Sequence, residues 1–366
     1  MRLVFLSEIT TPRLIPDLPG TRPIDEPVPP MPPVTPQSSP PLSQVRELPA
    51  GDKIIGFYLL TKAEVKPTRV GGQYLEIRLQ DASGTLHAKM WDGFEEFVAT
   101  AKAGDAVKLE GITDRYRDVP GLVVSRIRVA TPDEVPDANI FLPHSALSPE
   151  EARDQMEQLI GTVGNQHLRA LLDSVFHDDD IMSRFLKSPA GKQWHHAMIG
   201  GLAEHTIGIA RAVDSVCPLY LILNHDLALS GALLHDVGKI FELSAETAID
   251  YNSPGRLLGH IFMGADFVER RIALLPDFPD EIRMQVLHII LSHQGELENG
   301  SPVKPMTPEA LAIHYFDELD SRLEAFRRIR DQTPEGQPFS DYVKLMERYF
   351  YLRSINDDIQ SEENPS

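Results

Sequence analysis

The chain has 366 residues, a length typical of two domains with additional segments. Apolar residues make up 42% of it, enough for folded cores, and the single cysteine, Cys217, excludes a disulfide framework or a cysteine-rich zinc site. The formal net charge of −19 argues against non-specific coating of nucleic acid, although a strand could still be held in a local basic channel. No apolar run is long enough to span a membrane. We therefore expect a protein of the reducing cytoplasm without a membrane partner.

Residues 1–49 are dense in proline, with PVPPMPPVTP and SSPPLS among their letters. Such sequence favours extended, solvated chain and cannot bury a core, so we expect a disordered leader. A docking motif for a proline-recognising partner is the alternative interpretation.

Residues 50–132 change to short alternating strands separated by turns. In the run YLEIRLQD, Leu75, Ile77 and Leu79 fall on one face and polar residues on the other. Five strands with one short helix, FEEFVATAKAGD, predict a small all-β Greek-key barrel of the OB type. An SH3-like barrel and a small open sheet are the alternatives.

OB barrels bind single-stranded nucleic acid by stacking bases on aromatic side chains within a positive groove. The candidates here are the aromatic and basic residues of the predicted strands and first loop: Lys66, Arg69, Tyr74, Arg78, Lys89, Trp91, Arg115, Tyr116 and Arg117. The alternative is that Tyr74 and Trp91 fill the barrel core and that the charges are ordinary solvated positions.

Residues 133–147 read as a linker, and Ser148 then opens a helix as a capping box with Glu151. From there the apolar period is helical, so 148–355 are expected to form an all-α bundle, followed by an acidic, frayed tail at 356–366. The expected helices are 149–161, 165–176, 178–188, 201–217, 225–235, 255–274, 280–292, 308–330 and 340–352.

Histidine and aspartate residues recur inside these helical patterns. The set is His205, His235, Asp236, His260, His293 and Asp317. Any one of them is more simply explained as a hydrogen-bonded core residue. Burying the whole set without a metal would cost on the order of several kcal/mol, and helices of a bundle can aim such side chains at one point. Imidazole with carboxylate suits Mn, Fe, Ni, Co or Zn.

The set divides into two metal sites. The first is expected to consist of His205, His235, Asp236 and Asp317. Asp236 has two oxygens and would bridge to a second ion held by His260 and His293. A bound divalent ion would activate water and neutralise charge on a phosphate oxygen.

Three further residues are predicted to act with Asp236 in catalysis. Lys239, one turn later, is placed to bind a substrate phosphate, or only to complement the helix macrodipole. His195 and His196 precede the Gly200-Gly201 break. They could donate to phosphate or protonate the leaving oxygen, or serve as structural hydrogen-bond donors.

The order of His205, His235-Asp236 and Asp317 resembles the H…HD…D signature of HD-domain metal-dependent phosphohydrolases. His260, His293 and HDVGK resemble the multi-metal branch that includes the HD-GYP phosphodiesterases, although the GYP signature is absent. WHHAMIGGLAEHT, LLHDVGK, GHI and LSHQGELENGSPVKPMTPEALAIHYFDELDSR, after a predicted OB domain, are similar to the YhaM-type 3′–5′ exoribonucleases over about residues 51–352.

This resemblance implies an enzyme that removes nucleotides from the 3′ end of single-stranded RNA while the OB domain holds the strand. It implies Mn as the cofactor, with Fe, Ni, Co or Mg as alternatives, in one or two ions. One departure is Gln294, where the family pattern has a second histidine after His293. Gln294 is a poor ligand for a borderline metal, so the second site is expected to be weaker or completed by water.

Other functions remain open. One is a nucleotide or cyclic-dinucleotide phosphohydrolase, and another is a non-catalytic nucleic-acid-binding protein with a degenerate HD scaffold. RNA or DNA as the substrate and a homo-oligomeric state are also open.

Overall fold

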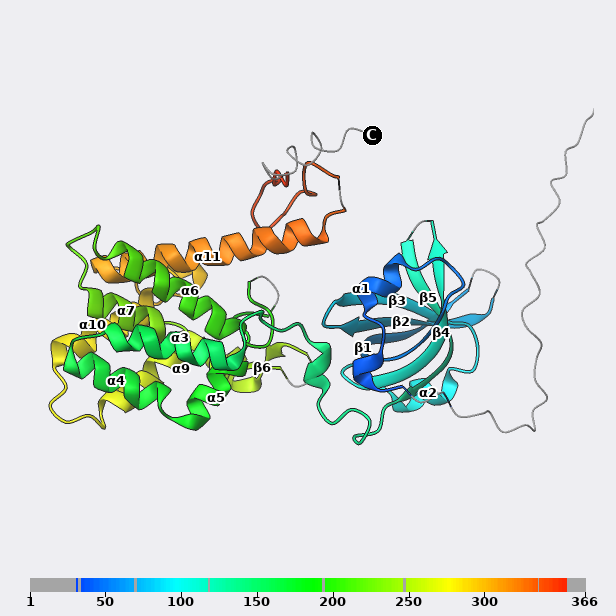
Figure 1. Cartoon of the computed structure of the whole chain (residues 1–366), viewed down its shortest axis with the longest axis horizontal. Helices are drawn as coiled ribbons and strands as arrows, with labels where there is room; N and C mark the ends of the chain where they lie inside the picture. The colour runs from blue at the N-terminus through cyan, green and yellow to red at the C-terminus, as the bar shows by residue number, and fades with distance from the viewer. Residues whose placement is uncertain are drawn as a thin grey trace, which may run out of the picture. The chain divides into compact units, whose positions relative to one another are not determined.

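The computed structural model describes residues 31, 34–68, 71–117, 119–192, 195–245, 248–334 and 336–353. Within these residues, a barrel of five strands is followed by a helical domain, as predicted (Figure 1). The barrel elements are β1 (Lys53–Pro67), β2 (Gln73–Asp81), β3 (Gly84–Met90), α2 (Glu95–Thr100), β4 (Ala106–Tyr116) and β5 (Val119–Val129).

The barrel closes in the order β1-β2-β3-β5-β4, with β1 pairing antiparallel to β4. The pairing of β3 with β5 is parallel, so the chain crosses from one to the other through α2 and β4. This closed five-stranded order is the OB-type topology that the sequence predicts, and it excludes an open sheet. Leu75, Ile77 and Leu79 are all fully buried, which confirms the predicted core face of β2.

The prediction of a disordered leader is wrong for its last part. Residues of this stretch form a 3-10 helix, η1 (Pro36–Ser38), and α1 (Leu42–Glu47), which packs on the barrel (Figure 1). Leu42 and Val45 are buried among the barrel's core side chains, and Leu42 N donates to Asp81 Oδ2 at 2.7 Å. The high proline content of the leader led to a prediction of disorder, although Leu42 and Val45 have the spacing of one helical face. Residues 1–30, 32 and 33 lie outside the described part.

The helical domain begins after η2 (Ala138–Phe141). Its helices are α3 (Pro149–Thr162), α4 (Gln166–Phe176), α5 (Asp179–Lys187), α6 (Gly201–Val216), α7 (His225–Leu234), α8 (Lys239–Glu242), α9 (Ser253–Ile272), α10 (Asp280–Ser292) and α11 (Pro308–Gln332). The short α8, the two-residue strands β6 (Leu243–Ser244) and β7 (Asp250–Tyr251), and the 3-10 helix η3 (Leu297–Asn299) were not predicted. The other helices agree with the predicted ranges to within about two residues. The predicted capping box at Ser148 is present, because Glu151 N donates to Ser148 Oγ and Ser148 N to Glu151 Oε2.

The predicted helix at 340–352 is wrong. The chain there forms an irregular hairpin with bridges between Phe339 and Tyr351 and between Val343 and Arg348. Its aromatic residues pack against one another across the turn instead of forming one helical face. The spacing of apolar residues in the sequence is compatible with both arrangements and cannot distinguish them.

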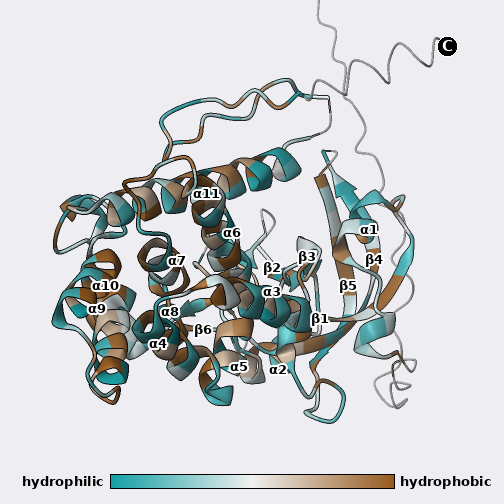
Figure 2. Cartoon of the chain, turned by 60° about the vertical axis from the view of Figure 1, so that its left-hand side comes forward, coloured by the Kyte–Doolittle hydropathy of each residue, from teal (hydrophilic) through white to brown (hydrophobic). Residues whose placement is uncertain are grey.

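α7 is the central helix of the domain. Every residue from Leu227 to Leu234 is buried, whereas the helices around it alternate between hydrophilic and hydrophobic residues (Figure 2). A helix that is apolar on all sides must be enclosed, so its C-terminal end, where the His235-Asp236 pair lies, is carried into the core. No helix in the described ranges combines the length and the apolar content that a membrane span needs.

The position of α1 generates a stability prediction. Leu42→Ala should lower the free energy of unfolding of the barrel by about 2–4 kcal/mol, because it leaves a cavity under α1. Urea unfolding, followed by the fluorescence of Trp91 in a Trp194→Phe background, measures this change. Gln44→Ala, on the exposed side of the same helix, is the matched control and should change it by less than about 0.5 kcal/mol. Equal effects of the two variants would contradict the packing of α1.

Candidate metal centre and nucleic-acid interface

Five helices bring the predicted ligands to one point of the helical domain. His205 lies on α6, His235 and Asp236 directly follow α7, and His260 lies on α9. His293 directly follows α10, and Asp317 lies on α11. All of these residues are buried except His260, which is partly buried. Because a helix, a helix end or a bend holds each side chain, the arrangement is rigid.

Asp236 lies at the centre, and its two oxygens face different histidines. Oδ2 is 3.4 Å from Nε2 of His205 and 3.4 Å from Nε2 of His235. Oδ1 is 3.4 Å from Nε2 of His260 and 3.4 Å from Nε2 of His293. The donors therefore form two triplets that share Asp236, each with its atoms within 4.8 Å of one another.

Asp317 extends the first triplet, since its Oδ1 lies 3.3 Å from His205 Nε2. The four Nε2 atoms are buried and have no hydrogen-bond partner among the described residues, and they face the two Asp236 oxygens, of which Oδ2 also pairs with the Lys239 ammonium. A buried polar atom left unpaired is costly, and here the unpaired atoms all point at each other. A cation between them would satisfy every one, so the residues present fit one or two divalent ions.

The opposite nitrogen of each histidine is held in place. His235 Nδ1 lies 2.7 Å from the Ala232 carbonyl, and His293 Nδ1 lies 2.8 Å from the Ile290 carbonyl. A carbonyl only accepts, so Nδ1 carries the proton and donates it. The lone pair of Nε2 is then free for a cation, which is the usual arrangement behind a metal-bound histidine.

Carboxylates hold the other two histidines. His205 Nδ1 is 2.7 Å from Asp320 Oδ2, and His260 Nδ1 is 3.1 Å from Glu242 Oε1. Asp320 and Glu242 were not predicted from the sequence. A signal was present for Asp320, because it lies three residues after Asp317 and therefore on the same face of α11.

Two glycines allow the helices to approach the centre. A Cβ atom on Gly238 would lie 2.0 Å from the His260 carbonyl oxygen, so only glycine lets α9 pack this closely beside the His235-Asp236 pair. Within α9, Gly259 has φ 74° and interrupts the helix directly before His260. The interruption frees the His260 amide, which donates to Glu242 Oε1 at 3.0 Å.

Opposite charges lie close together in the site. Burial alone would raise the pKa of Asp236, but the charge of Lys239 holds it well below its usual range. Burial would likewise lower the pKa of His205, but the negative carboxylates of Asp236, Asp317 and Asp320 around the ring raise it well above its usual range. The Lys239 ammonium lies 2.5 Å from Asp236 Oδ2, and this carboxylate keeps its pKa raised despite burial. Since a cation would have to displace the His205 proton, metal binding should release protons.

The adjacent residues His195 and His196 have different surroundings. His196, in a left-handed backbone conformation, lies with Nε2 2.9 Å from Asp320 Oδ2, behind His205 and away from the Asp236 oxygens. This place favours the structural interpretation of His196. His195 lines the open cavity. Burial, then the charges of Lys239 and His205, lower its pKa to about 3. A neutral ring can donate one hydrogen bond but has no extra proton to give to a leaving oxygen.

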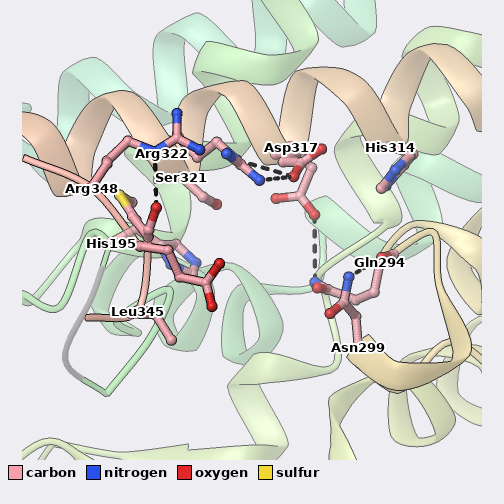
Figure 3. Close-up of a pocket in the computed structure, with 12 residues that line it drawn as sticks. His195, Gln294, Asn299, His314, Asp317, Ser321, Arg322, Leu345 and Arg348 are labelled. Carbon is pink, nitrogen blue, oxygen red and sulfur yellow. Dashed lines mark hydrogen bonds and ion pairs between the residues drawn. The ribbon is translucent and has the colours of Figure 1, made fainter. Parts of the chain in front are cut away.

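The centre opens to solvent through two neighbouring cavities of about 490 and 460 Å³, which share His195, Gln294 and Asn299. The first is lined by Asp317 and by the C-terminal hairpin, and the second by Lys239 and His260. Figure 3 shows the first cavity. Gln294 Nε2 donates to Asp317 Oδ2 at 3.4 Å, so its amide lies on the side of the first triplet.

The barrel brings together five of the residues predicted to bind nucleic acid. The rings of Tyr74 and Trp91 are 5.2 Å apart, and Lys89 Nζ lies 6.0 Å from the Tyr74 ring and 5.4 Å from the Tyr116 ring. The Arg117 guanidinium lies 5.3 Å from the Tyr116 ring. Trp91 is 50% exposed and Tyr116 60% exposed, so they do not fill the core. This set, Tyr74, Lys89, Trp91, Tyr116 and Arg117, is called the aromatic face below.

The remaining candidates are not part of the aromatic face. Lys66 pairs with Glu76 at 2.6 Å, and Arg115 donates to a backbone carbonyl of α1. Arg78 is exposed on β2. Arg69 lies outside the described residues.

The carboxylates behind the histidines generate a prediction. Asp320→Asn should weaken binding of one ion, and Glu242→Gln binding of the other, each by about 10- to 100-fold, because each histidine loses its anchor. Calorimetric titration of the metal-free protein with Mn²⁺ measures the affinity of both ions. Asp331→Asn, on the exposed end of α11, is the control. If neither variant differs from the control, the anchoring role is refuted.

A family model described as "HD domain" matches residues 202–322, which include both triplets, Asp317 and Asp320. Among solved structures, the barrel is similar to the second OB-fold domain of replication protein A from Methanococcus maripaludis, at 19% identity over 23% of this chain and 90% of that one, with a TM-score of 0.20. It is also similar to a mitochondrial single-stranded DNA binding protein from S. cerevisiae, at 11% identity over 22% of this chain and 95% of that one, with a TM-score of 0.21. These TM-scores are too low to support an argument. The barrel is therefore assigned to the OB type from its own strand order. The chain thus carries an OB-type barrel followed by an HD domain with an intact histidine–aspartate cluster.

Proposed function

We propose that this chain is a metal-dependent phosphodiesterase that shortens single-stranded RNA from its 3′ end, in the manner of the YhaM-type exoribonucleases that its motifs resemble. The observation that carries the proposal is the group of buried, unpaired Nε2 atoms facing both oxygens of Asp236. A structural histidine core would leave no such atoms unpaired.

The donor set supports a borderline metal. Four imidazoles and the carboxylates of Asp236 and Asp317 suit Mn, Fe, Ni or Co better than Mg, which prefers oxygen ligands alone. When bound, such ions would supply an activated water near neutral pH and neutralise charge on phosphate oxygens. His205, His235, Asp236 and Asp317 would hold the first ion. Asp236, His260 and His293 would hold the second.

Two further side chains would act on the substrate. Lys239 lines the cavity beside His260, and its raised pKa keeps it charged, so it can bind a phosphate oxygen. His195 lies where both cavities meet and is neutral, so it can donate a hydrogen bond to substrate without repelling the ions. Both roles orient the phosphodiester for attack by water.

The aromatic face would hold the strand. It lies on the β2–β3 side and at the β4–β5 turn, the surfaces that OB barrels use for oligonucleotides. Stacking on Trp91 and Tyr74 does not depend on base identity, which suits an enzyme that degrades RNA of any sequence. The face is also local, which reconciles strand binding with a net charge of −19.

The first test is hydrolysis. Purified protein with Mn²⁺ should shorten a 5′-labelled single-stranded RNA stepwise and leave cyclic dinucleotides and mononucleotides intact. Asp236→Ala should abolish turnover and lower the bound metal, because it removes the proposed bridging ligand. Metal content by mass spectrometry and product ladders on gels measure the two effects.

The control for this test is Asp331→Ala, which should match the wild type. Hydrolysis of only small nucleotides would replace the proposal with a nucleotide phosphohydrolase. A metal-free protein that stays inactive after Mn²⁺ is added would support the scaffold alternative.

The aromatic face generates a separate prediction. Trp91→Ala should weaken binding of a ten-nucleotide RNA by about 1–3 kcal/mol, because one base loses its stacking partner. Lys89→Ala should weaken binding and lower its salt dependence. Lys53→Ala removes a lysine that pairs with Glu110 and is the matched control. Fluorescence anisotropy at several salt concentrations gives the values. Equal effects of the two lysine variants would argue against this face.

A further inference from the structure

The C-terminal hairpin, residues 336–353, is held together by backbone hydrogen bonds and contacts α11. Ser340 N donates to the Phe350 carbonyl at 2.9 Å, and Val343 N donates to the Arg348 carbonyl at 2.9 Å. The Phe350 ring packs edge-on against Phe326 of α11, with centroids 5.4 Å apart. The hairpin is therefore a defined element over the end of α11 (Figure 1).

The outer side of the hairpin carries two aromatic pairs. Tyr342 and Tyr349 have ring centroids 5.2 Å apart, and Phe339 and Tyr351 have centroids 5.3 Å apart. Each of the four rings is between 52% and 63% exposed. So many exposed rings in a short segment form an apolar surface that calls for a binding partner.

The turn of the hairpin forms a wall of the first cavity. Leu345, Met346, Glu347 and Arg348 line it together with His195 and Asp317 of the metal centre. Figure 3 shows Leu345 and Arg348 across the cavity from Gln294 and Asn299. Tyr342 and Tyr349 therefore flank, in the sequence, the hairpin residues that line the first cavity.

We propose that the hairpin is a stacking platform for the substrate strand, in which Tyr342 and Tyr349 hold bases next to the nucleotide at the metal centre. This proposal rests on the proposed function. A strand that enters the cavity past Arg348 must pass along the hairpin, and exposed tyrosine rings bind the faces of any base. The platform would be separate from the aromatic face of the barrel and would act on bases close to the cut. It would make longer strands better substrates than dinucleotides.

The test compares substrates of two lengths. The full chain with Tyr342→Ala and Tyr349→Ala should show a ratio of kcat/KM for a ten-nucleotide RNA to that for a dinucleotide about tenfold below the wild type, since two stacking partners are lost. Replacement of both tyrosines by tryptophan should restore the ratio, because stacking needs only a ring. The same measurement on a DNA of identical sequence tests whether stacking is indifferent to the sugar.

The control is Tyr220→Ala, which removes a ring 60% exposed in the turn after α6 and should leave the ratio unchanged. An unchanged ratio in the double alanine variant would overturn the platform. The platform would also be overturned if the ratio falls and light scattering shows that the double variant has a different oligomeric state. In that case a second copy of the chain, and not the substrate, covers the rings. If the wild type cleaves no RNA, the proposed function fails first. Unaltered affinity of the double variant for a phosphorothioate RNA would then reject the platform too.

Discussion

The arrangement of the HD domain depends on one buried carboxylate. Asp236 presents one oxygen to His205 and His235 and the other to His260 and His293, and none of these contacts is a hydrogen bond. A carboxylate is stable at such depth only with compensating positive charge, which Lys239 supplies in part. The rest of the compensation is what divalent ions would provide. Folding and metal binding should therefore be coupled in this domain, and the protein should be more stable with metal than without.

The surrounding structure keeps the imidazoles in one orientation. Backbone carbonyls hold His235 and His293, while the carboxylates of Asp320 and Glu242 hold the other two. His196 belongs to this outer layer, because it contacts Asp320 and not the cavity. A site built in this way requires little rearrangement on binding a cation, so its geometry favours a metal with a defined coordination shell. Gly238 serves the same purpose through the backbone, since any side chain there would separate α9 from the Asp236 oxygens.

Three aromatic or basic surfaces are relevant to a long substrate: the aromatic face of the barrel, the cavity wall at His195, and the C-terminal hairpin. Under the proposed function, each would contact a different part of an extended strand, and none would read base identity by hydrogen bonds. Such a division would let an acidic protein act on a polyanion. Lys239 and bound ions would supply positive charge locally to a phosphate, and aromatic rings would hold the bases in place of a basic surface.

The sequence by itself determined the elements and the ligand types. The alternation in β2, the helical period after Ser148 and the embedded histidines are local patterns. The barrel, the bundle and the six candidate ligand positions follow from them. Tertiary structure alone decided the rest. The hydrogen bonds from His205 to Asp320 and from His260 to Glu242 join residues 115 and 18 positions apart, and no local period encodes such pairs. Likewise, α1 is stabilised because Leu42 is buried in the barrel core. A hairpin forms in place of the predicted helix because its rings pack against each other and against Phe326. Packing between distant segments stabilises α1 and the hairpin, and the local sequence pattern does not show which distant segments will pack together.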